Sequence, residues 1–397
     1  MGRIPRLHFG PGAAAALPEI IATHGRRALL VTGGRSFRDS GRWPELQAGL
    51  EARGIIWAAA TVEAEPSPDD IDSIVAAHRG AGIEVVVGIG GGSALDTAKA
   101  VAGLLPGDGT VRDHLEGIGP GLALTGPTLP FVAVPTTAGT GSEATRNAVL
   151  TERGPQGFKR SFRDERLVAV EAVVDPDLLA GAAPSLIAAN GLDALTQLLE
   201  PYVSARAGPL TDALALDGLA RAADALPAWH ALAASAPRVL PRATAGPRAA
   251  MAYAALLSGI CLANAGLGAV HGLASPLGAH IAIPHGVACG AVLTAATEAN
   301  IVALTAPAPS SPALGRYAVL GRLVTHAAAV DDDEARQRLL AWLSELTARL
   351  GVPGLGSFGL TSADIPTIVA ESRGSSMRTN PIELTDAEIA SILERSR

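Results

Sequence analysis

The chain has 397 residues, of which 48% are hydrophobic and only 3% aromatic, and its formal net charge is −7. This length suffices for two domains with separate cores, and the mild negative charge argues against a nucleic-acid or membrane-surface partner. Two cysteines exclude a disulfide framework, and the first residues show no signal-peptide pattern, so we expect a cytoplasmic protein.

Short apolar runs alternate with stretches of helical period in the first half of the chain. The runs at residues 28–33, 84–89 and 131–134 are each followed by glycine or threonine, and helical patterns at 43–53 and 69–79 lie between them. This alternation predicts βαβ units and a parallel sheet. Ligands of such sheets bind at the carboxyl ends of the strands, where these small residues fall.

The pattern changes near Pro184. Several helical stretches follow, with no run typical of a strand; they cover residues 187–203, 210–226, 248–262 and 334–350. We therefore predict an α/β nucleotide-binding domain with a parallel sheet over residues 1–183 and an all-helical domain over residues 184–397.

Two loops at strand ends are candidates for binding phosphate groups. Gly90-Gly91-Gly92-Ser93 leads from an expected strand into a helix, and Thr136-Thr137-Ala138-Gly139-Thr140-Gly141-Ser142-Glu143 follows the next expected strand. Glycine lets the backbone approach a ligand, and free N–H groups at a helix start attract anions. The first loop is not the GxGxxG fingerprint. A tight turn would explain either loop alone, but the two together favour a phosphate-rich cofactor.

Three histidines, among them His271 and His285, lie in the apolar stretch 269–288. Imidazoles in apolar surroundings need partners for their ring nitrogens, either backbone carbonyls or a divalent metal. Upstream, Asp193 and Gln197 are four residues apart on an expected helix and share a face. Asp193, His271 and His285 form a three-ligand set with an open position, the pattern of a catalytic metal site, and Gln197 offers a weak uncharged fourth donor.

Together these segments resemble the iron-containing (group III) alcohol dehydrogenase family, which shares its fold with glycerol dehydrogenase and dehydroquinate synthase. The resemblance spans almost the whole chain and is strongest at residues 90–99, 135–143, 193–204 and 271–286. It implies the dehydroquinate synthase-like fold and hydride transfer between NAD(P) and a small alcohol/aldehyde pair. It also implies a homodimer or a larger homo-oligomer.

The resemblance further implies a ligand set. In the family an Asp and three His hold the metal; Asp193, His271 and His285 fall on three of these positions, and Gln197 falls on the fourth. Because an imidazole is replaced by a neutral amide, we expect weaker metal binding than in the family, and zinc (Zn²⁺) is favoured over iron (Fe²⁺).

A second departure concerns the proton relay. Ser275 stands where many members of the family have a His near the nicotinamide, so the relay is expected to run through Ser275 and the ribose hydroxyls, or through His280. The two lost imidazoles leave open a metal-independent reductase of the maleylacetate type and a dinucleotide-binding homologue with impaired catalysis. A dehydroquinate synthase-like cyclisation is less favoured, because the chain lacks the Lys, Arg and Asn density that a phosphorylated sugar acid demands.

The cofactor contacts that the resemblance implies fall on the strand-end loops. The first strand ends Gly33-Gly34-Arg35-Ser36, where NAD-preferring members often carry an Asp. Glycine and positive charge leave room for a 2′-phosphate, so NADP(H) is expected over NAD(H). The contacts carried over are Gly33, Gly34, Ser36, Gly91, Gly92, Ser93, Thr136, Thr137, Thr140, Ser142 and Lys159.

Overall fold

The computed structural model of the protein describes residues 2–153, 157–235, 245–305 and 310–397. The chain forms two compact units, residues 1–180 and 181–397. The first unit is α/β with a parallel sheet, and every regular element described in the second is helical, so the predicted fold class is confirmed.

The first unit is built on a six-stranded parallel sheet with the strand order β1-β8-β5-β4-β2-β3. The three strands predicted from apolar runs are β2, β4 and β5, which lie side by side within it. The sheet strands are β1 (Arg6–Phe9), β2 (Arg27–Gly33), β3 (Ile56–Val62), β4 (Val85–Gly90), β5 (Phe131–Pro135) and β8 (Glu171–Val174). A separate antiparallel pair consists of β6 (Asn147–Glu152) and β7 (Phe158–Arg163).

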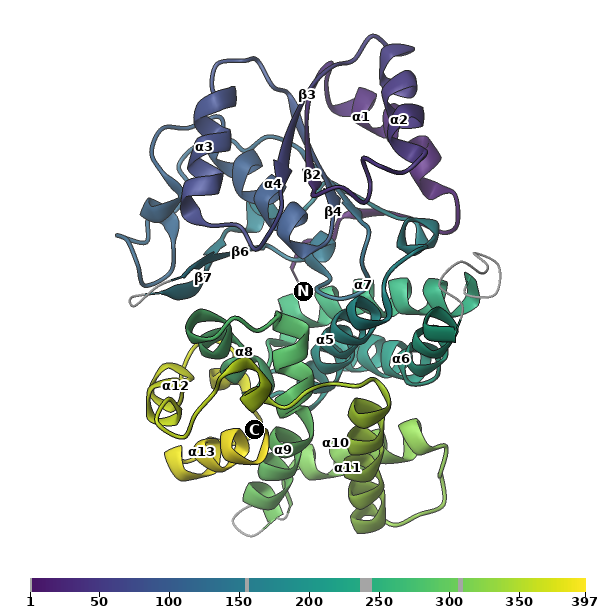
Figure 1. Ribbon diagram of the computed structural model, residues 1–397, viewed down its shortest axis with the longest axis vertical. Coiled ribbons are helices and arrows are strands. Elements are labelled where there is room, and N and C mark those ends of the chain that lie inside the picture. The colour runs from purple at the N-terminus through teal and green to yellow at the C-terminus, as the bar shows by residue number, and fades with distance from the viewer. Residues whose placement is uncertain (1, 154–156, 236–244, 306–309) are drawn as a thin grey trace. The chain divides into compact units, whose positions relative to one another are not determined.

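Helices cover both faces of this sheet (Figure 1). Side chains alternate along a strand, so Ala28 and Leu30 of β2 pack with the first two helices while Leu29 and Val31 pack with the next two. Burial on both faces explains why the central strands are continuous apolar runs. The helices are α1 (Leu17–His24), α2 (Arg42–Glu51), α3 (Pro68–His78) and α4 (Gly92–Leu104).

The second unit surrounds one buried helix, α5, which contacts α6, α7 and α9. Every residue of α5 from Gly191 to Val203 is buried, polar ones included. The helices are α5 (Pro184–Val203), α6 (Pro209–Ser235), α7 (Ala245–Ala265), α8 (Ala269–His280), α9 (His285–Thr305), α10 (Pro312–Thr325), α11 (Asp332–Arg349), α12 (Ile365–Glu371) and α13 (Asp386–Arg395).

Two of these helices, α7 and α9, are long and apolar enough to span a membrane by length and composition. Their most apolar windows are 67% and 61% buried inside the structure. Such burial is typical of core helices in a globular unit.

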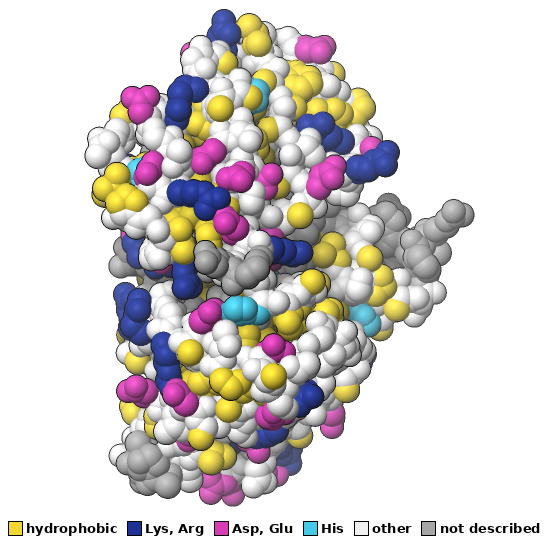
Figure 2. Space-filling model, turned by 60° about the vertical axis from the view of Figure 1, so that its left-hand side comes forward, with side chains coloured by type: hydrophobic (Ala, Val, Ile, Leu, Met, Phe, Trp, Pro, Cys, Tyr) yellow, Lys and Arg dark blue, Asp and Glu magenta, His cyan; other side chains and the backbone are white. Residues whose placement is uncertain are grey.

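The surface carries charges of both signs. Acidic and basic side chains intermingle on the face shown in Figure 2. Several form pairs one helical turn apart, such as Arg221 with Asp217 and Arg338 with Glu334. Exposed pairs of this kind contribute little to stability, so the fold depends mainly on its buried contacts.

Two glycines allow α9 to lie close to α5. A Cβ atom on Gly286 would lie 2.1 Å from the carbonyl oxygen of Ala189, and one on Gly290 would lie 2.7 Å from the side chain of Leu192. Only glycine permits backbones to approach this closely. The contact brings the amino-terminal turn of α9, with His285, beside the segment of α5 that carries Asp193.

We therefore expect Gly286→Ala to destabilise the protein. The added methyl group meets backbone rather than a movable side chain, so the helices must separate, at a cost of about 1–3 kcal/mol. A thermal melt should show a lower midpoint for this variant. The matched control is Gly315→Ala in α10, where nothing lies within 4 Å of the added methyl, and its midpoint should stay the same or rise. Equal midpoints for Gly286→Ala and the wild type would contradict the close contact.

Candidate active site

Four side chains from three helices converge inside the helical unit. Asp193 comes from α5, His271 from α8, and His285 and Cys289 from α9. Each offers one ligand atom, and these atoms all lie within 4.8 Å of one another. A carboxylate oxygen, two imidazole nitrogens and a sulfur are ligands that divalent transition metals accept, so the donor set fits such a cation.

Distances within the group are short. Asp193 Oδ1 lies 3.2 Å from His271 Nε2 and 3.7 Å from His285 Nε2. Cys289 Sγ lies 3.8 Å from each of these three atoms. The side chains of Asp193, His271 and Cys289 are buried, whereas that of His285 is 24% exposed. The group is therefore reached from the side of His285.

The charges in this group stabilise one another. Burial alone would raise the pKa of Asp193, but the imidazoles of His285 and His271 and a hydrogen bond with Gln197 outweigh it and hold that pKa below its ordinary value. Burial would likewise raise the pKa of the Cys289 thiol, yet His271 and His285 lower it. The site therefore favours the anionic forms of both acids, which are the forms that bind a cation.

Glu200 fixes the orientation of His271. Its Oε2 atom lies 2.6 Å from His271 Nδ1, and its Oε1 atom accepts a 2.7 Å hydrogen bond from the backbone N–H of Val270. Both ring nitrogens of His271 face carboxylates, and although burial would lower the pKa of this imidazole, Cys289, Glu200 and Asp193 hold it well above its ordinary value. On binding a cation Nε2 would lose its proton, while the contact with Glu200 would keep the other proton on Nδ1. Asn380 accepts from the backbone N–H of Ala269 at 3.0 Å, so two side chains cap the start of α8.

Gln197, expected as a weak fourth donor, lies next to the group, and its side chain has hydrogen-bond partners there. Its Oε1 atom lies 3.1 Å from Ser258 Oγ, and its side chain also bonds to Asp193. The fourth member of the group is Cys289, which the sequence analysis did not single out. The available signal was its spacing, because Cys289 lies one helical turn after His285 and so shares its face.

The two candidate relay residues lie in different places. Ser275 is half-buried one turn after His271, with its hydroxyl 3.4 Å from the carbonyl oxygen of His271. His280 ends α8 at the surface and pairs with Glu371 at 2.9 Å. Of the two, only Ser275 contacts a residue of the group, and it does so through the backbone of His271.

In the first unit, the structure brings the two glycine- and threonine-rich loops together. Residues Gly90 and Pro135 at the ends of β4 and β5 are paired, and the backbone N–H of Thr136 donates to Gly90 at 2.9 Å. A Cβ atom on Gly91 would lie 3.3 Å from Thr137, and one on Gly92 would lie 2.7 Å from Thr140. Helix α4 starts here, and no side chain caps its first turn, so backbone N–H groups there can attract an anion.

The Ser142 hydroxyl takes part in a buried network beneath these loops. It donates to Asp96 Oδ1 at 2.5 Å and accepts from Lys99 Nζ at 2.9 Å. Lys99 also donates to the Thr145 hydroxyl and to the backbone carbonyl of Asn147. The network holds the second loop against α4.

The remaining expected cofactor contacts lie at other positions on the first unit. Gly33 lies beside Gly90, where an added Cβ would be 3.1 Å from the Gly33 nitrogen, and Gly34 is half-buried. Ser36 is exposed, and Lys159 on β7 forms a 2.7 Å ion pair with Glu65. The structure thus places Gly33 with the two loops and pairs Lys159 with a carboxylate.

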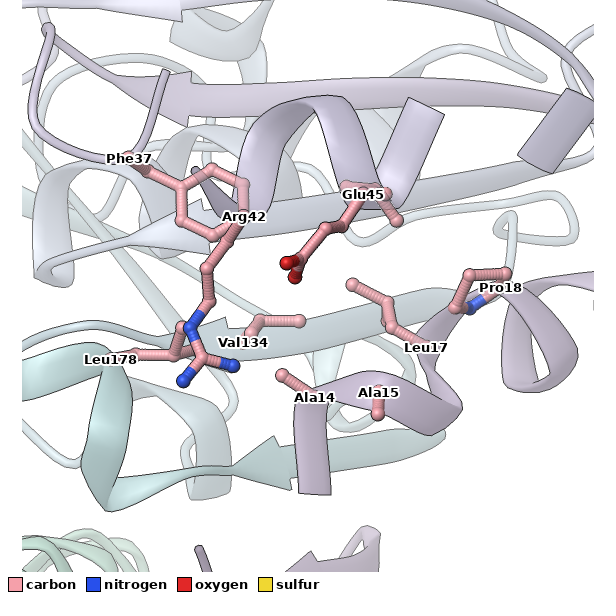
Figure 3. A pocket seen from close by; sticks show the side chains of 10 residues that line it. Ala14, Ala15, Leu17, Pro18, Phe37, Arg42, Glu45, Val134 and Leu178 are labelled. Carbon is pink, nitrogen blue, oxygen red and sulfur yellow. The ribbon is translucent and has the colours of Figure 1, made fainter. Parts of the chain in front are cut away.

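A small pocket on the first unit is shown in Figure 3; its cavity volume is about 180 Å³. It lies between α1, α2 and β5, with Phe37, Val134 and Leu178 in its lining, and the carboxylate of Glu45 points into it. Arg42 at its edge lies 3.9 Å from Asp175. Pockets for drug-sized ligands are larger, and this one is lined mainly by apolar core residues, so it is not our candidate site.

Comparison with solved structures defines the class of protein. The crystal structure of 1,3-propanediol oxidoreductase superposes with a TM-score of 0.87 at 29% identity, and the match covers 100% of both chains. An α/β unit followed by a helical unit is thus an arrangement that this chain shares with a solved oxidoreductase.

Sequence comparisons give the family. Residues 5–176 match the iron-containing alcohol dehydrogenase family, and residues 187–397 match its C-terminal part. Alcohol dehydrogenase 4 of Saccharomyces cerevisiae (strain YJM789) is 31% identical, with 99% of this chain and 97% of that protein covered. The 1,3-propanediol dehydrogenase of Klebsiella pneumoniae shows the same identity and coverage. The chain belongs to the iron-containing alcohol dehydrogenase family and is an oxidoreductase that acts on CH–OH groups.

Glu143, in the second loop, gives the first unit a pH-dependent stability. Burial raises the pKa of this carboxyl to about 7 from an ordinary 4.5, and its own backbone and Lys99 offset burial only in part. The folded state therefore keeps a proton that the unfolded state has lost. The free energy of unfolding should fall as pH rises from 4.5 through 7, by about 3 kcal/mol at most.

A Glu143→Gln variant keeps the shape but cannot ionise, so we expect its melting midpoint to exceed that of the wild type at pH 8 and to match it near pH 4.5. The exposed Glu63→Gln variant is the control and should change neither midpoint. A gain of the same size at both pH values would mean that Glu143 does not titrate as described.

Proposed function

We propose that this family member is a metal-assisted alcohol dehydrogenase and aldehyde reductase that uses NADP(H) with a small alcohol/aldehyde pair. The observation that supports the metal is the convergence of Asp193, His271, His285 and Cys289 on one point, with Glu200 behind His271. Four donors of suitable chemistry in a mostly buried group, one of them backed by a second carboxylate, match the known design of metal centres.

A nicotinamide bound to the first unit would supply hydride exchange with the carbinol carbon, and a cation held by Asp193, His271, His285 and Cys289 would supply Lewis acidity toward the substrate oxygen. The chain itself contributes position and charge. Glu200 holds a proton at His271 Nδ1, so that Nε2 is the nitrogen that would bind the cation. The exposed side of His285 is where the substrate oxygen would arrive. Ser275, one turn from His271, is the residue that we propose for the proton relay.

The alternative of a metal-independent reductase rests on the loss of two family imidazoles, at Gln197 and Ser275. The donor group argues against it, because the group keeps four ligand atoms despite the first loss.

The preference for NADP(H) is supported by the end of β2. Gly33 and Gly34 are followed by Arg35, whose side chain is exposed and lies 3.5 Å from Asp39. A guanidinium suits recognition of a 2′-phosphate, whereas a carboxylate at the strand end would repel it. We also propose that the protein forms a homo-oligomer. We further propose a cytoplasmic location, because Cys261 and Cys289 are both free thiols and thiols stay reduced in that compartment.

Replacing His271 by Ala tests the metal. We expect elemental analysis to find bound metal in the wild type and little in the variant, and turnover of alcohols to fall to background, because the variant loses a donor and leaves Glu200 Oε2 without its imidazole partner. His230→Ala, in the same unit on α6, should keep both metal and turnover. Full turnover by a metal-free His271→Ala enzyme would refute the metal-assisted mechanism and favour the metal-independent alternative.

Replacing Arg35 by Ala tests the cofactor. Loss of a charge-assisted contact with the 2′-phosphate should raise the KM for NADPH by roughly 10-fold and leave that for NADH unchanged. Steady-state kinetics with both cofactors measure the difference, and Arg221→Ala, on the other unit, controls for a change in net charge. A wild-type enzyme that clearly prefers NADH overturns this part of the proposal.

A further inference from the structure

Cys289 and Cys261 differ in the atoms that surround their sulfurs. Its Sγ atom is fully buried and lies 3.8 Å from a ligand atom of Asp193, of His271 and of His285. Cys261, also buried, contacts only the backbone carbonyl of Thr211, at 3.5 Å, among the hydrogen-bond partners described for it. A cysteine that merely fills the core needs no such set of neighbours.

We propose that Cys289 is a thiolate ligand of the metal, that it replaces the imidazole absent at position 197, and that the resulting donor set selects zinc over iron(II). This inference rests on the proposed function, since it assumes that the group holds a divalent cation. It departs from the ligand set of three imidazoles and one carboxylate that the family resemblance implies.

The separations support direct ligation. A tetrahedral cation with bonds of about 2.0 Å to nitrogen and oxygen and about 2.3 Å to sulfur places its ligand atoms roughly 3.3–3.5 Å apart. The measured separations are 3.2 Å between Asp193 and His271, 3.7 Å between Asp193 and His285, and 3.8 Å from Cys289 to each. Small side-chain movements of a few tenths of an ångström would therefore suffice for all four atoms to share one ion.

The position of Gln197 supports the same assignment. Its amide oxygen lies 3.1 Å from Ser258 Oγ, and its side chain bonds to Asp193, so it orients the carboxylate. In contrast, the Cys289 sulfur has only members of the donor group as described partners. Gln197 and Cys289 occupy equivalent positions on their helices. Gln197 lies four residues after Asp193 on α5, and Cys289 lies four residues after His285 on α9.

The chemical consequence is a change in metal preference. A thiolate is a soft donor, and zinc binds combinations of thiolate, imidazole and carboxylate readily, whereas sites of harder donors discriminate less against iron(II). With four protein ligands, a substrate oxygen would bind as a fifth ligand, a coordination number that catalytic zinc can adopt in the transition state.

The test substitutes cobalt(II) for the native metal in the full-length enzyme. Direct sulfur ligation gives an intense near-ultraviolet charge-transfer band, which should be present in the wild type and in Cys261→Ser and absent in Cys289→Ser. Chelator competition under anaerobic conditions should show zinc affinity lower by at least about 10-fold in Cys289→Ser, and a smaller preference for zinc over iron(II). Cys261→Ser should behave as the wild type in both measurements.

Should Cys289→Ser fail to fold, X-ray absorption by the zinc-loaded wild type gives the answer without a variant, through a sulfur scatterer at about 2.3 Å from zinc. If metal binds with no sulfur signature in either spectrum, the ligand assignment is overturned while the metal-assisted function stands. If the wild type binds no metal and still turns over alcohols, the proposed function and this inference both fail.

Discussion

The contact between Glu200 and His271 is the constraint on which the candidate metal site depends. One carboxylate accepts from the first turn of α8 and from the imidazole that the same helix carries. The helix start favours a negative charge, and the imidazole proton satisfies the second oxygen. A buried carboxylate would otherwise be expensive, so its presence on the core helix α5 indicates that the position and tautomer of His271 matter.

The same helix supplies both a ligand and the group that orients another ligand. Asp193 and Glu200 are seven residues apart, which is close to two helical turns, so both side chains project from one face of α5. Helix α8 crosses that face with His271 between them, its Nε2 toward Asp193 and its Nδ1 toward Glu200. A rigid buried helix is a suitable base for such a pair, because a site on a packed element keeps its geometry better than one on a loop.

The sequence predicted the parts of this structure that have strong local signals. The central strands β2, β4 and β5 are buried on both faces and so read as apolar runs, and the helices of the second unit have clear periodicity. The strands β1 and β8 are only four residues long, and β3 is half-exposed, so their patterns are too weak to find.

The site was predictable to a similar degree. Asp193, His271 and His285 are unusual in apolar stretches and match a family pattern, and the structure brings them together. A lone cysteine or a glutamate on a helix carries no such signal, because its role depends on which helix face meets which neighbour. Cys289 and Glu200 therefore became visible only with the packing of α5, α8 and α9. For Ser142 the loop was predicted from the sequence as a cofactor-binding loop, but the bonding of its side chain was not. Its hydroxyl accepts a hydrogen bond from the buried Lys99.

A ligand set with Cys289 would differ from the family's in charge as well as in softness. Carboxylate and thiolate together neutralise both charges of a divalent cation, whereas one carboxylate and three imidazoles leave a net positive charge. The cation would then withdraw less electron density from a substrate oxygen, so activation of that oxygen would depend more on exclusion of water and on positioning by the protein. Because α5 and α9 meet through glycine contacts, positions 197 and 289 are both close to the same point. If Cys289 ligates the cation as proposed, α9 supplies the donor that is absent from α5, and the charge of the centre differs while the backbone arrangement stays the same.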